Sequence, residues 1–82
     1  MTNKHIAPRF EIISWDEEGP ELINKVGVND FDDFWAAVQI CIEIDKQTEE
    51  DIRVACYQQG ELNLIIKPEK EKEGLRLKSI KI

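Results

Sequence analysis

The sequence predicts an α+β fold, in which an antiparallel sheet of about four strands carries one long amphipathic helix, and a short helix before it, on one face. Segments of alternating apolar and polar side chains, rich in β-branched residues, recur towards both ends of the chain. A segment with helical spacing of its apolar residues lies between them. A chain of 82 residues has room for one small core and no deep cleft, so we expect residues 1–82 to form a single domain.

The first strand is expected at residues 9–15, RFEIISW, which are rich in aromatic and β-branched side chains. Residues 1–7 before it are expected to be disordered. The next segment begins with a proline and ends at Gly27, which favours a short helix over residues 20–26. The alternative is a second strand over residues 21–28 that forms a hairpin with the first.

A long helix is expected over residues 30–46, with Asn29 or Asp30 as its N-cap. Aspartates in its first turn complement the partial positive charge of a helix N-terminus. Its apolar side chains form two adjoining stripes, one of Phe31, Phe34, Trp35, Val38, Cys41 and Ile42 and the other of Ala37, Ile40 and Ile44. Because one sheet face rarely needs so much apolar surface, we expect the first helix or another chain to cover part of it.

Three further strands are expected after this helix, at residues 52–57, 61–67 and 75–82. Residues 68–74, PEKEKEG, alternate in charge and contain both proline and glycine, so they are expected to form a mobile loop. The apolar positions of the last segment change phase near Ser79, where we expect a β-bulge.

The turn between the first two of these strands decides which side chains share a face. A turn of Gln59 and Gly60 alone mixes apolar and polar residues on both faces. A three-residue loop with Gly60 in the left-handed conformation pairs Cys56 with Leu62 and separates the faces. We therefore expect the second register. The apolar positions of the strands and of the long helix predict a core of Phe10, Ile12, Leu22, Phe31, Phe34, Trp35, Val38, Cys41, Ile42, Ile52, Val54, Cys56, Leu62, Leu64, Ile66 and Leu75.

No residue pattern in the chain is that of an active site, so we expect a noncatalytic protein with no catalytic residues. The single histidine, His5, falls in the segment expected to be disordered, and nucleophilic catalysis usually needs a base. Cys41 and Cys56 lie in apolar segments and are expected to be buried thiols. Neither a zinc signature nor a glycine-rich phosphate loop is present, so no metal and no cofactor are expected.

The composition bears on the partners and the location of the protein. The chain has a net charge of −6, although residues 67–82 carry six basic and only three acidic side chains. A strongly acidic body disfavours direct nucleic-acid binding, which rests largely on cations. No apolar run approaches the roughly 20 residues needed to cross a membrane, and the N-terminus lacks an apolar signal segment. We expect no membrane contact and a cytoplasmic location.

These observations favour a small acidic interaction or regulatory protein that binds a partner protein. Complementary charge on the partner would speed the encounter. In one form of this hypothesis the partner is a basic nucleic-acid-binding protein that is inhibited by charge mimicry. The candidate partner-binding surface consists of Asp16, Glu17, Glu18, Glu21, Asp30, Asp32 and Asp33.

Two alternatives remain open at this stage. The first is a structural homodimer, or a subunit of a larger assembly, joined through a sheet face that the helices leave uncovered. Its candidate interface residues are Ile13, Trp15, Tyr57 and Ile65. The second is a minimal oligomeric enzyme that uses a carboxylate and Tyr57.

Overall fold

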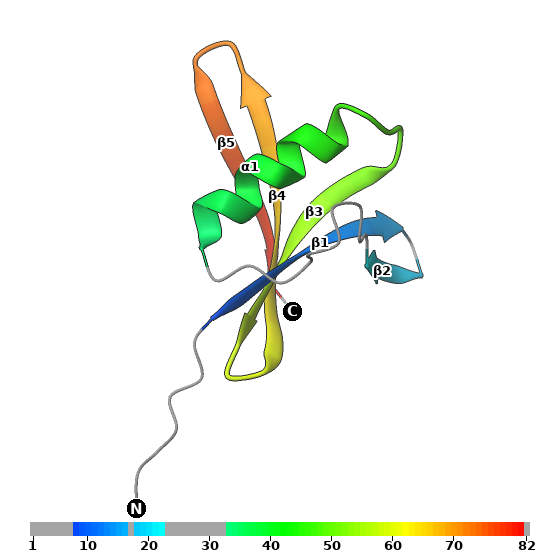
Figure 1. Cartoon of the computed structure of the whole chain (residues 1–82), viewed down its shortest axis with the longest axis vertical. Coiled ribbons are helices and arrows are strands. Elements are labelled where there is room, and N and C mark those ends of the chain that lie inside the picture. The colour runs from blue at the N-terminus through cyan, green and yellow to red at the C-terminus, as the bar shows by residue number, and fades with distance from the viewer. Residues whose placement is uncertain (1–7, 17, 23–32, 82) are drawn as a thin grey trace, which may run out of the picture.

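The computed structural model describes residues 8–16, 18–22 and 33–81; within these, it does not describe the side chains of residues 20–22 and 81. The described residues form one antiparallel sheet of five strands, in the order β2-β1-β3-β4-β5, and one helix (Figure 1). The elements are β1 Arg9–Asp16, β2 Gly19–Leu22, α1 Phe34–Asp45, β3 Asp51–Gln58, β4 Glu61–Glu71 and β5 Gly74–Lys81. The α+β class is therefore confirmed, and strands occupy all four segments in which the sequence predicts them.

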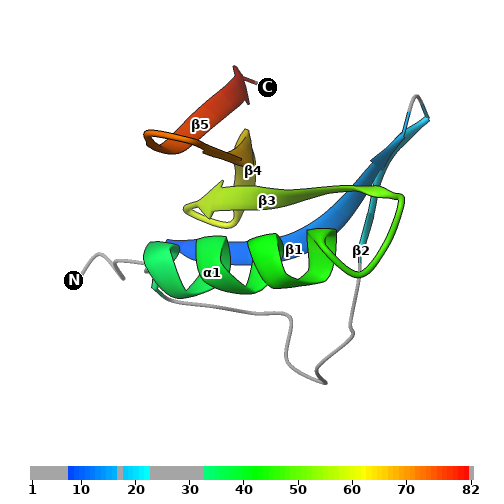
Figure 2. The same ribbon diagram turned by 90° about the horizontal axis from the view of Figure 1, so that it is seen from above.

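Helix α1 lies across one face of the sheet, where it packs against β1, β3 and β4 (Figure 2). It begins later than the expected residue 30. Its N-cap is Asp33, which has an extended backbone and accepts a hydrogen bond from the Trp35 amide at 3.2 Å. The expected caps Asn29 and Asp30 lie outside the described residues. None of the described helices has the length and apolar character needed to span a membrane.

The short helix expected over residues 20–26 is not present where the structure describes this segment. Pro20 and Leu22 belong to β2, which pairs with β1 from Asp16 opposite Gly19 to Ile13 opposite Leu22. Gly19 has φ +127°, a conformation that glycine adopts without steric cost and that turns the chain back onto β1. Proline lacks an N–H but is tolerated on an edge strand. The alternative, a strand that forms a hairpin with the first, was therefore correct for residues 21 and 22. Residues 23–28 lie outside the described residues.

Residues 68–74 do not form the expected loop. Strand β4 continues to Glu71, and β5 begins at Gly74 after two turn residues. The alternating charges that favoured a loop instead meet across the hairpin, because Glu69 pairs with Lys78 and Glu71 with Arg76, each at 3.0 Å. The pairing between the two strands is continuous, so the bulge expected near Ser79 is absent. The expected disorder of residues 1–7 lies outside the described part of the chain.

The β-bulge lies instead in the β3–β4 hairpin. The turn contains only Gln59 and Gly60, with φ values of +54° and +79°, as in a two-residue type I′ hairpin. Tyr57 then pairs with Leu62 but Cys56 pairs with Leu64, so one extra residue of β4 is unpaired. The extra residue reverses the phase of β4. A tight turn and two separated faces are therefore compatible, although the expected three-residue loop was wrong.

The main core lies between α1 and the sheet. Its buried members are Ile12, Ala37, Cys41, Ile44, Ile52, Val54, Cys56 and Ile66, with Phe10, Phe34, Ile40 and Leu64 packed against them. Trp35 and Leu75 were expected in the core but are 56% and 42% exposed. Leu75 is exposed because α1 does not reach β5.

The sheet forks between β3 and β4. These strands pair only from Gln58 opposite Glu61 to Val54 opposite Ile66. Towards its start, β3 stays paired with β1 as far as Asp51 opposite Trp15, whereas β4 continues beside β5 alone. Figure 1 shows the β4–β5 hairpin rising away from β3. The fork leaves a groove between the two diverging strands.

Truncation of Ile52, which is fully buried, should lower the free energy of unfolding more than truncation of Leu75 does. We expect Ile52→Ala to cost about 2 to 5 kcal/mol, because it removes apolar contacts and leaves a cavity. Leu75→Ala should cost less than about 1 kcal/mol, because its side chain is already partly in water. Urea denaturation of both variants measures the difference. Equal losses would contradict the core described here.

Candidate functional site

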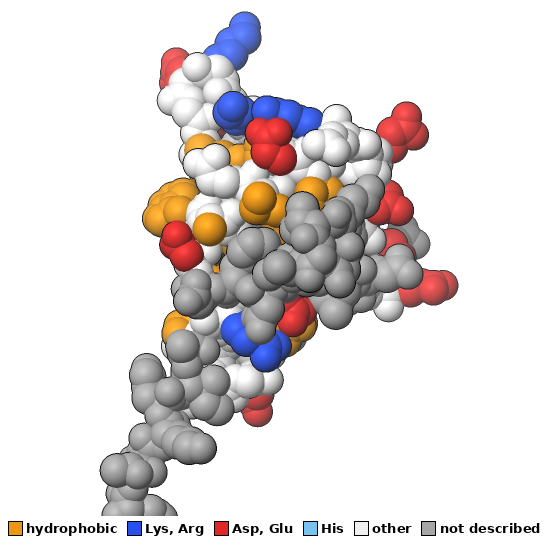
Figure 3. Space-filling view, in the orientation of Figure 1, with side chains coloured by type: hydrophobic (Ala, Val, Ile, Leu, Met, Phe, Trp, Pro, Cys, Tyr) orange, Lys and Arg blue, Asp and Glu red, His pale blue; other side chains and the backbone are white. Residues whose placement is uncertain are grey.

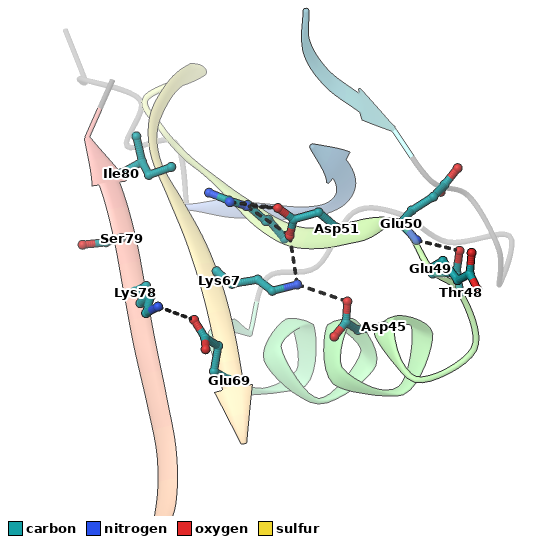
Figure 4. Close-up of a pocket in the computed structure, with 11 residues that line it drawn as sticks. Asp45, Thr48, Glu49, Glu50, Asp51, Lys67, Glu69, Lys78, Ser79 and Ile80 are labelled. Carbon is teal, nitrogen blue, oxygen red and sulfur yellow. Dashed lines mark hydrogen bonds and ion pairs between the residues drawn. The ribbon is translucent and has the colours of Figure 1, made fainter. Parts of the chain in front are cut away.

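A groove with a volume of about 870 Å³ lies at the fork (Figure 4). It is open to solvent and lies between the end of α1, the start of β3 and the β4–β5 hairpin. Charged residues of both signs dominate its lining, which consists of Asp45, Thr48, Glu49, Glu50, Asp51, Arg53, Lys67, Glu69, Lys78, Ser79 and Ile80. Its chemistry depends on how these charges are paired.

Lys67 lies at the centre of this groove and has three acceptors. Its Nζ lies 3.1 Å from Asp45 Oδ1, 2.9 Å from Asp51 Oδ1 and 3.1 Å from the carbonyl oxygen of Ile52. An ammonium group has three N–H donors, so these contacts use all of them. Burial acts to lower the pKa of Lys67, but its hydrogen bonds to Asp51 and Asp45 outweigh that effect and raise it. Lys67 is therefore a fully engaged cation.

Asp51 is paired a second time by Arg53, whose Nε and Nη2 donate to its carboxylate at 3.2 and 2.9 Å. Burial acts to raise the pKa of Asp51, but the hydrogen bonds from Arg53 and Lys67 outweigh it and lower the pKa below the ordinary value. Asp51 therefore stays ionised at neutral pH. The groups at the base of the groove are held in mutual ion pairs.

The cysteines are buried as expected. Burial is the main cause that raises the pKa of Cys41 to about 12, and it raises the pKa of Cys56 to about 11. Since the thiolate is the reactive form, neither thiol is activated as a nucleophile at neutral pH. The Cys41 thiol instead donates to the carbonyl oxygen of Ile52 at 3.5 Å. Within residues 8–16, 18–22 and 33–81, no three His, Cys, Asp or Glu side chains are gathered as a metal site would require.

The seven carboxylates of the expected partner-binding surface do not form one cluster. Asp16 and Glu18 flank the β1–β2 turn, where Asp16 Oδ1 accepts a hydrogen bond from the Glu18 amide at 2.8 Å. Asp33 lies at the opposite end of the sheet, because the helix that it caps starts beside Phe10 of β1. The backbone of Glu21 lies in β2 and its side chain is not described. Glu17, Asp30 and Asp32 lie outside the described residues.

The structure brings Asp16 and Glu18 close to a different pair of carboxylates. Trp15 pairs with Asp51, so the residues after Trp15 and the residues before Asp51 lie at one end of the sheet. We call the four exposed carboxylates that the structure describes there the acidic end; they are Asp16, Glu18, Glu49 and Glu50. Figure 3 shows carboxylates gathered along the right-hand edge of the molecule. The sequence missed this grouping because it depends on the pairing of β1 with β3.

The four expected interface residues do share one face, the one opposite α1. Ile13 and Ile65 are nevertheless buried within this chain, together with Ala55, because Trp15, Tyr57 and Leu62 pack against them. Side chains of the same chain therefore cover Ile13 and Ile65, whereas the homodimer hypothesis expects them to be uncovered.

The two aromatic residues on this face, Trp15 and Tyr57, are half-buried, and an arginine guanidinium lies over each ring. The guanidinium of Arg53 lies 5.2 Å from the Trp15 ring, and that of Arg9 lies 5.4 Å from the Tyr57 ring. Burial, followed by the negative charge of Glu11 and a hydrogen bond to it, raises the pKa of Tyr57. The phenol therefore remains protonated at neutral pH, which disfavours Tyr57 as a catalytic base.

Comparison of the chain with protein-family models, with curated proteins and with solved structures found no match. The arrangement of charge and exposed surface therefore carries the functional argument.

Removal of the Lys67 ammonium should destabilise the fold. We expect Lys67→Met to cost about 1.5 to 3 kcal/mol, because it leaves Asp45, Asp51 and the Ile52 carbonyl without a shared donor. Lys70→Met is the matched control, since it removes an exposed lysine from the same strand and should change stability by less than about 0.5 kcal/mol. Thermal and urea unfolding of both variants provide the measurement. Equal stability of the two variants would show that the Lys67 contacts contribute nothing.

Acid should weaken the fold through Asp51. Its pKa is lower in the folded chain than in the unfolded chain, so its contribution is complete above the unfolded value and is lost as pH falls through the folded value. The wild type should therefore lose stability more steeply than Asp51→Asn as the pH is lowered from about 5 to about 2.5. Urea unfolding across this range measures both slopes. Parallel curves would contradict the assigned shift.

Proposed function

We propose that the protein is a small noncatalytic binding protein that engages a basic partner protein through its acidic end. The observation that carries this proposal is the gathering of Asp16, Glu18, Glu49 and Glu50 at one end of the sheet. Within the described part of the chain, none of these four forms an ion pair. Among the described residues, their negative charge therefore faces solvent without an ion-pair partner.

The contrast with the neighbouring groove supports this choice of surface. Asp45 and Asp51 lie beside the acidic end, but Lys67 and Arg53 pair with them. Cations are thus available in this region of the molecule, and they pair with Asp45 and Asp51 rather than with Glu49 and Glu50, which also line the groove. A field of one sign over a small area attracts and orients a partner of the opposite sign.

The pairing of groups in the groove also favours binding over catalysis. Lys67 directs its three donors to acceptors of its own chain, and the Cys41 thiol has a pKa of about 12. Catalytic groups commonly have pKa values tuned towards the working pH, whereas the shifts here hold each group in its ordinary ionisation state. These groups stabilise the fork, and their engaged donors and ordinary ionisation states leave none of them suited to bind or activate a substrate.

In its more specific form, the proposal makes the partner a nucleic-acid-binding protein whose cationic site the acidic end occupies. Such a site is built to neutralise phosphates, so a cluster of carboxylates competes for the same cations. This form predicts that the partner cannot bind nucleic acid and this protein together.

A capture experiment with two charge variants tests the proposal. In the first variant, Asp16→Asn, Glu18→Gln, Glu49→Gln and Glu50→Gln neutralise the acidic end. The second removes the same amount of charge elsewhere, from the exposed Glu43, Glu61, Glu71 and Glu73, each changed to Gln. Immobilised protein is exposed at low salt to a lysate of the cells that produce it, and retained proteins are identified by mass spectrometry.

We expect a basic protein to be retained by the wild type and the second variant, and lost from the first. Its release should be promoted by salt, which screens exposed charges beyond about 10 Å at 0.1 M. The purified partner is then tested for nucleic-acid binding with and without this protein. Retention of the same proteins by both variants, or of no basic protein, would overturn the proposal.

A further inference from the structure

Strand β5 is a long open edge of the sheet. It pairs with β4 and with no other described strand, and α1 does not reach it. In an antiparallel ladder, alternate residues direct their N–H and C=O groups to the neighbouring strand, so half of the backbone groups of an edge strand point outward. Figure 2 shows β5 at the side of the sheet far from α1. The edge is therefore accessible to another extended chain.

The side chains of this edge are unusually apolar for an exposed strand. Leu75, Leu77 and Ile80 are 42%, 36% and 39% exposed. Leu77 pairs with Pro68, which lies two residues beyond the core residue Ile66 on β4, so Leu75 and Leu77 project from the side of the sheet that carries α1. Cations on an edge strand commonly prevent unwanted pairing with other chains, whereas exposed leucines favour such pairing.

The charge of this edge has one sign. No acidic residue occurs from Gly74 to the end of the chain, whereas Arg76 and Lys78 project from the opposite side to the leucines. Arg76 uses its Nε on Glu71, and Lys78 forms one ion pair with Glu69. Guanidinium and ammonium groups have further donors, so each can bind a second carboxylate. Residues 67–82 also retain an excess of basic side chains.

We propose that β5 binds an extended acidic segment of a partner protein, which adds to the sheet as a further strand. Its backbone completes the outward ladder of β5. Its acidic side chains face Arg76 and Lys78, and the residues between them pack beside Leu75 and Leu77. This mode of recognition takes affinity from main-chain hydrogen bonds and specificity from alternate side chains.

Charge complementarity selects this occupant over a second copy of β5. Two β5 strands in an antiparallel pair would bring cations of both copies onto one face, and like charges across a ladder are destabilising. The surface is separate from the acidic end and takes a partner of the opposite charge, so the proposal does not rest on the function proposed above.

The test uses a fluorescent ten-residue peptide of alternating glutamate and valine, titrated with the full chain at low salt. We expect saturable anisotropy and, by NMR, at least about tenfold slower hydrogen exchange at alternate β5 amides. A peptide of alternating lysine and valine controls for charge. A glutamate–valine peptide methylated at alternate backbone nitrogens controls for strand pairing, and should bind at least about tenfold more weakly.

Two variants locate the site on the protein. Lys78→Gln removes a cation from the edge, and Lys70→Gln removes one from the inner strand of the same hairpin. We expect only the first to weaken binding, by about fivefold or more at low salt. Melting curves verify that both remain folded, since the Lys78–Glu69 pair is exposed.

Several outcomes would overturn the proposal. They are the absence of binding at about 1 mM peptide, equal binding of the methylated peptide, and unchanged exchange of the β5 amides in the complex. Protection of those amides in the protein alone, increasing with its concentration, would assign the edge to a second copy instead.

Discussion

The forked sheet depends on the contacts of the Lys67 ammonium with Asp45, Asp51 and the Ile52 carbonyl oxygen. Where β4 leaves β3, the backbone of Ile52 has lost its neighbour on that side. Its N–H donates to Asp45 Oδ1 at 3.4 Å, and its carbonyl accepts from Lys67 at 3.1 Å and from the Cys41 thiol at 3.5 Å. Side chains from α1 and β4 thus replace the missing strand, as buried backbone polar groups require. The same ammonium links Asp45 at the end of α1 to Asp51 at the start of β3.

The fork also separates the two charged surfaces. Because β4 departs from β3, the β4–β5 hairpin carries the basic end of the chain away from α1 and leaves Leu75 and Leu77 exposed. The start of β3 stays beside β1, which places Glu49 and Glu50 near the β1–β2 turn. The acidic carboxylates that come earlier in the sequence and the basic side chains at its end therefore lie on two separate surfaces. We propose partners of opposite charge for these surfaces.

Local patterns were sufficient to predict the elements but not their association. Periodicity located α1 and the four longer strands, and it placed Ile52 and Val54 in the core. It misread residues 68–74 as a loop, because nothing local shows that their charges meet those of β5. The candidate sites are harder still to predict. Lys67 lies 22 residues from Asp45, and the acidic end exists only because β1 pairs with β3.

A double-mutant cycle between Lys67 and Asp51 tests the central claim most directly. The free energy of unfolding is measured for the wild type, for Lys67→Met, for Asp51→Asn and for the double variant. Exposed ion pairs typically couple by less than about 1 kcal/mol. If Lys67 holds the fork, the pair should couple by more than about 1 kcal/mol, because the Lys67 side chain is only 19% exposed and all donors of its ammonium group are engaged. Additive losses would contradict the account.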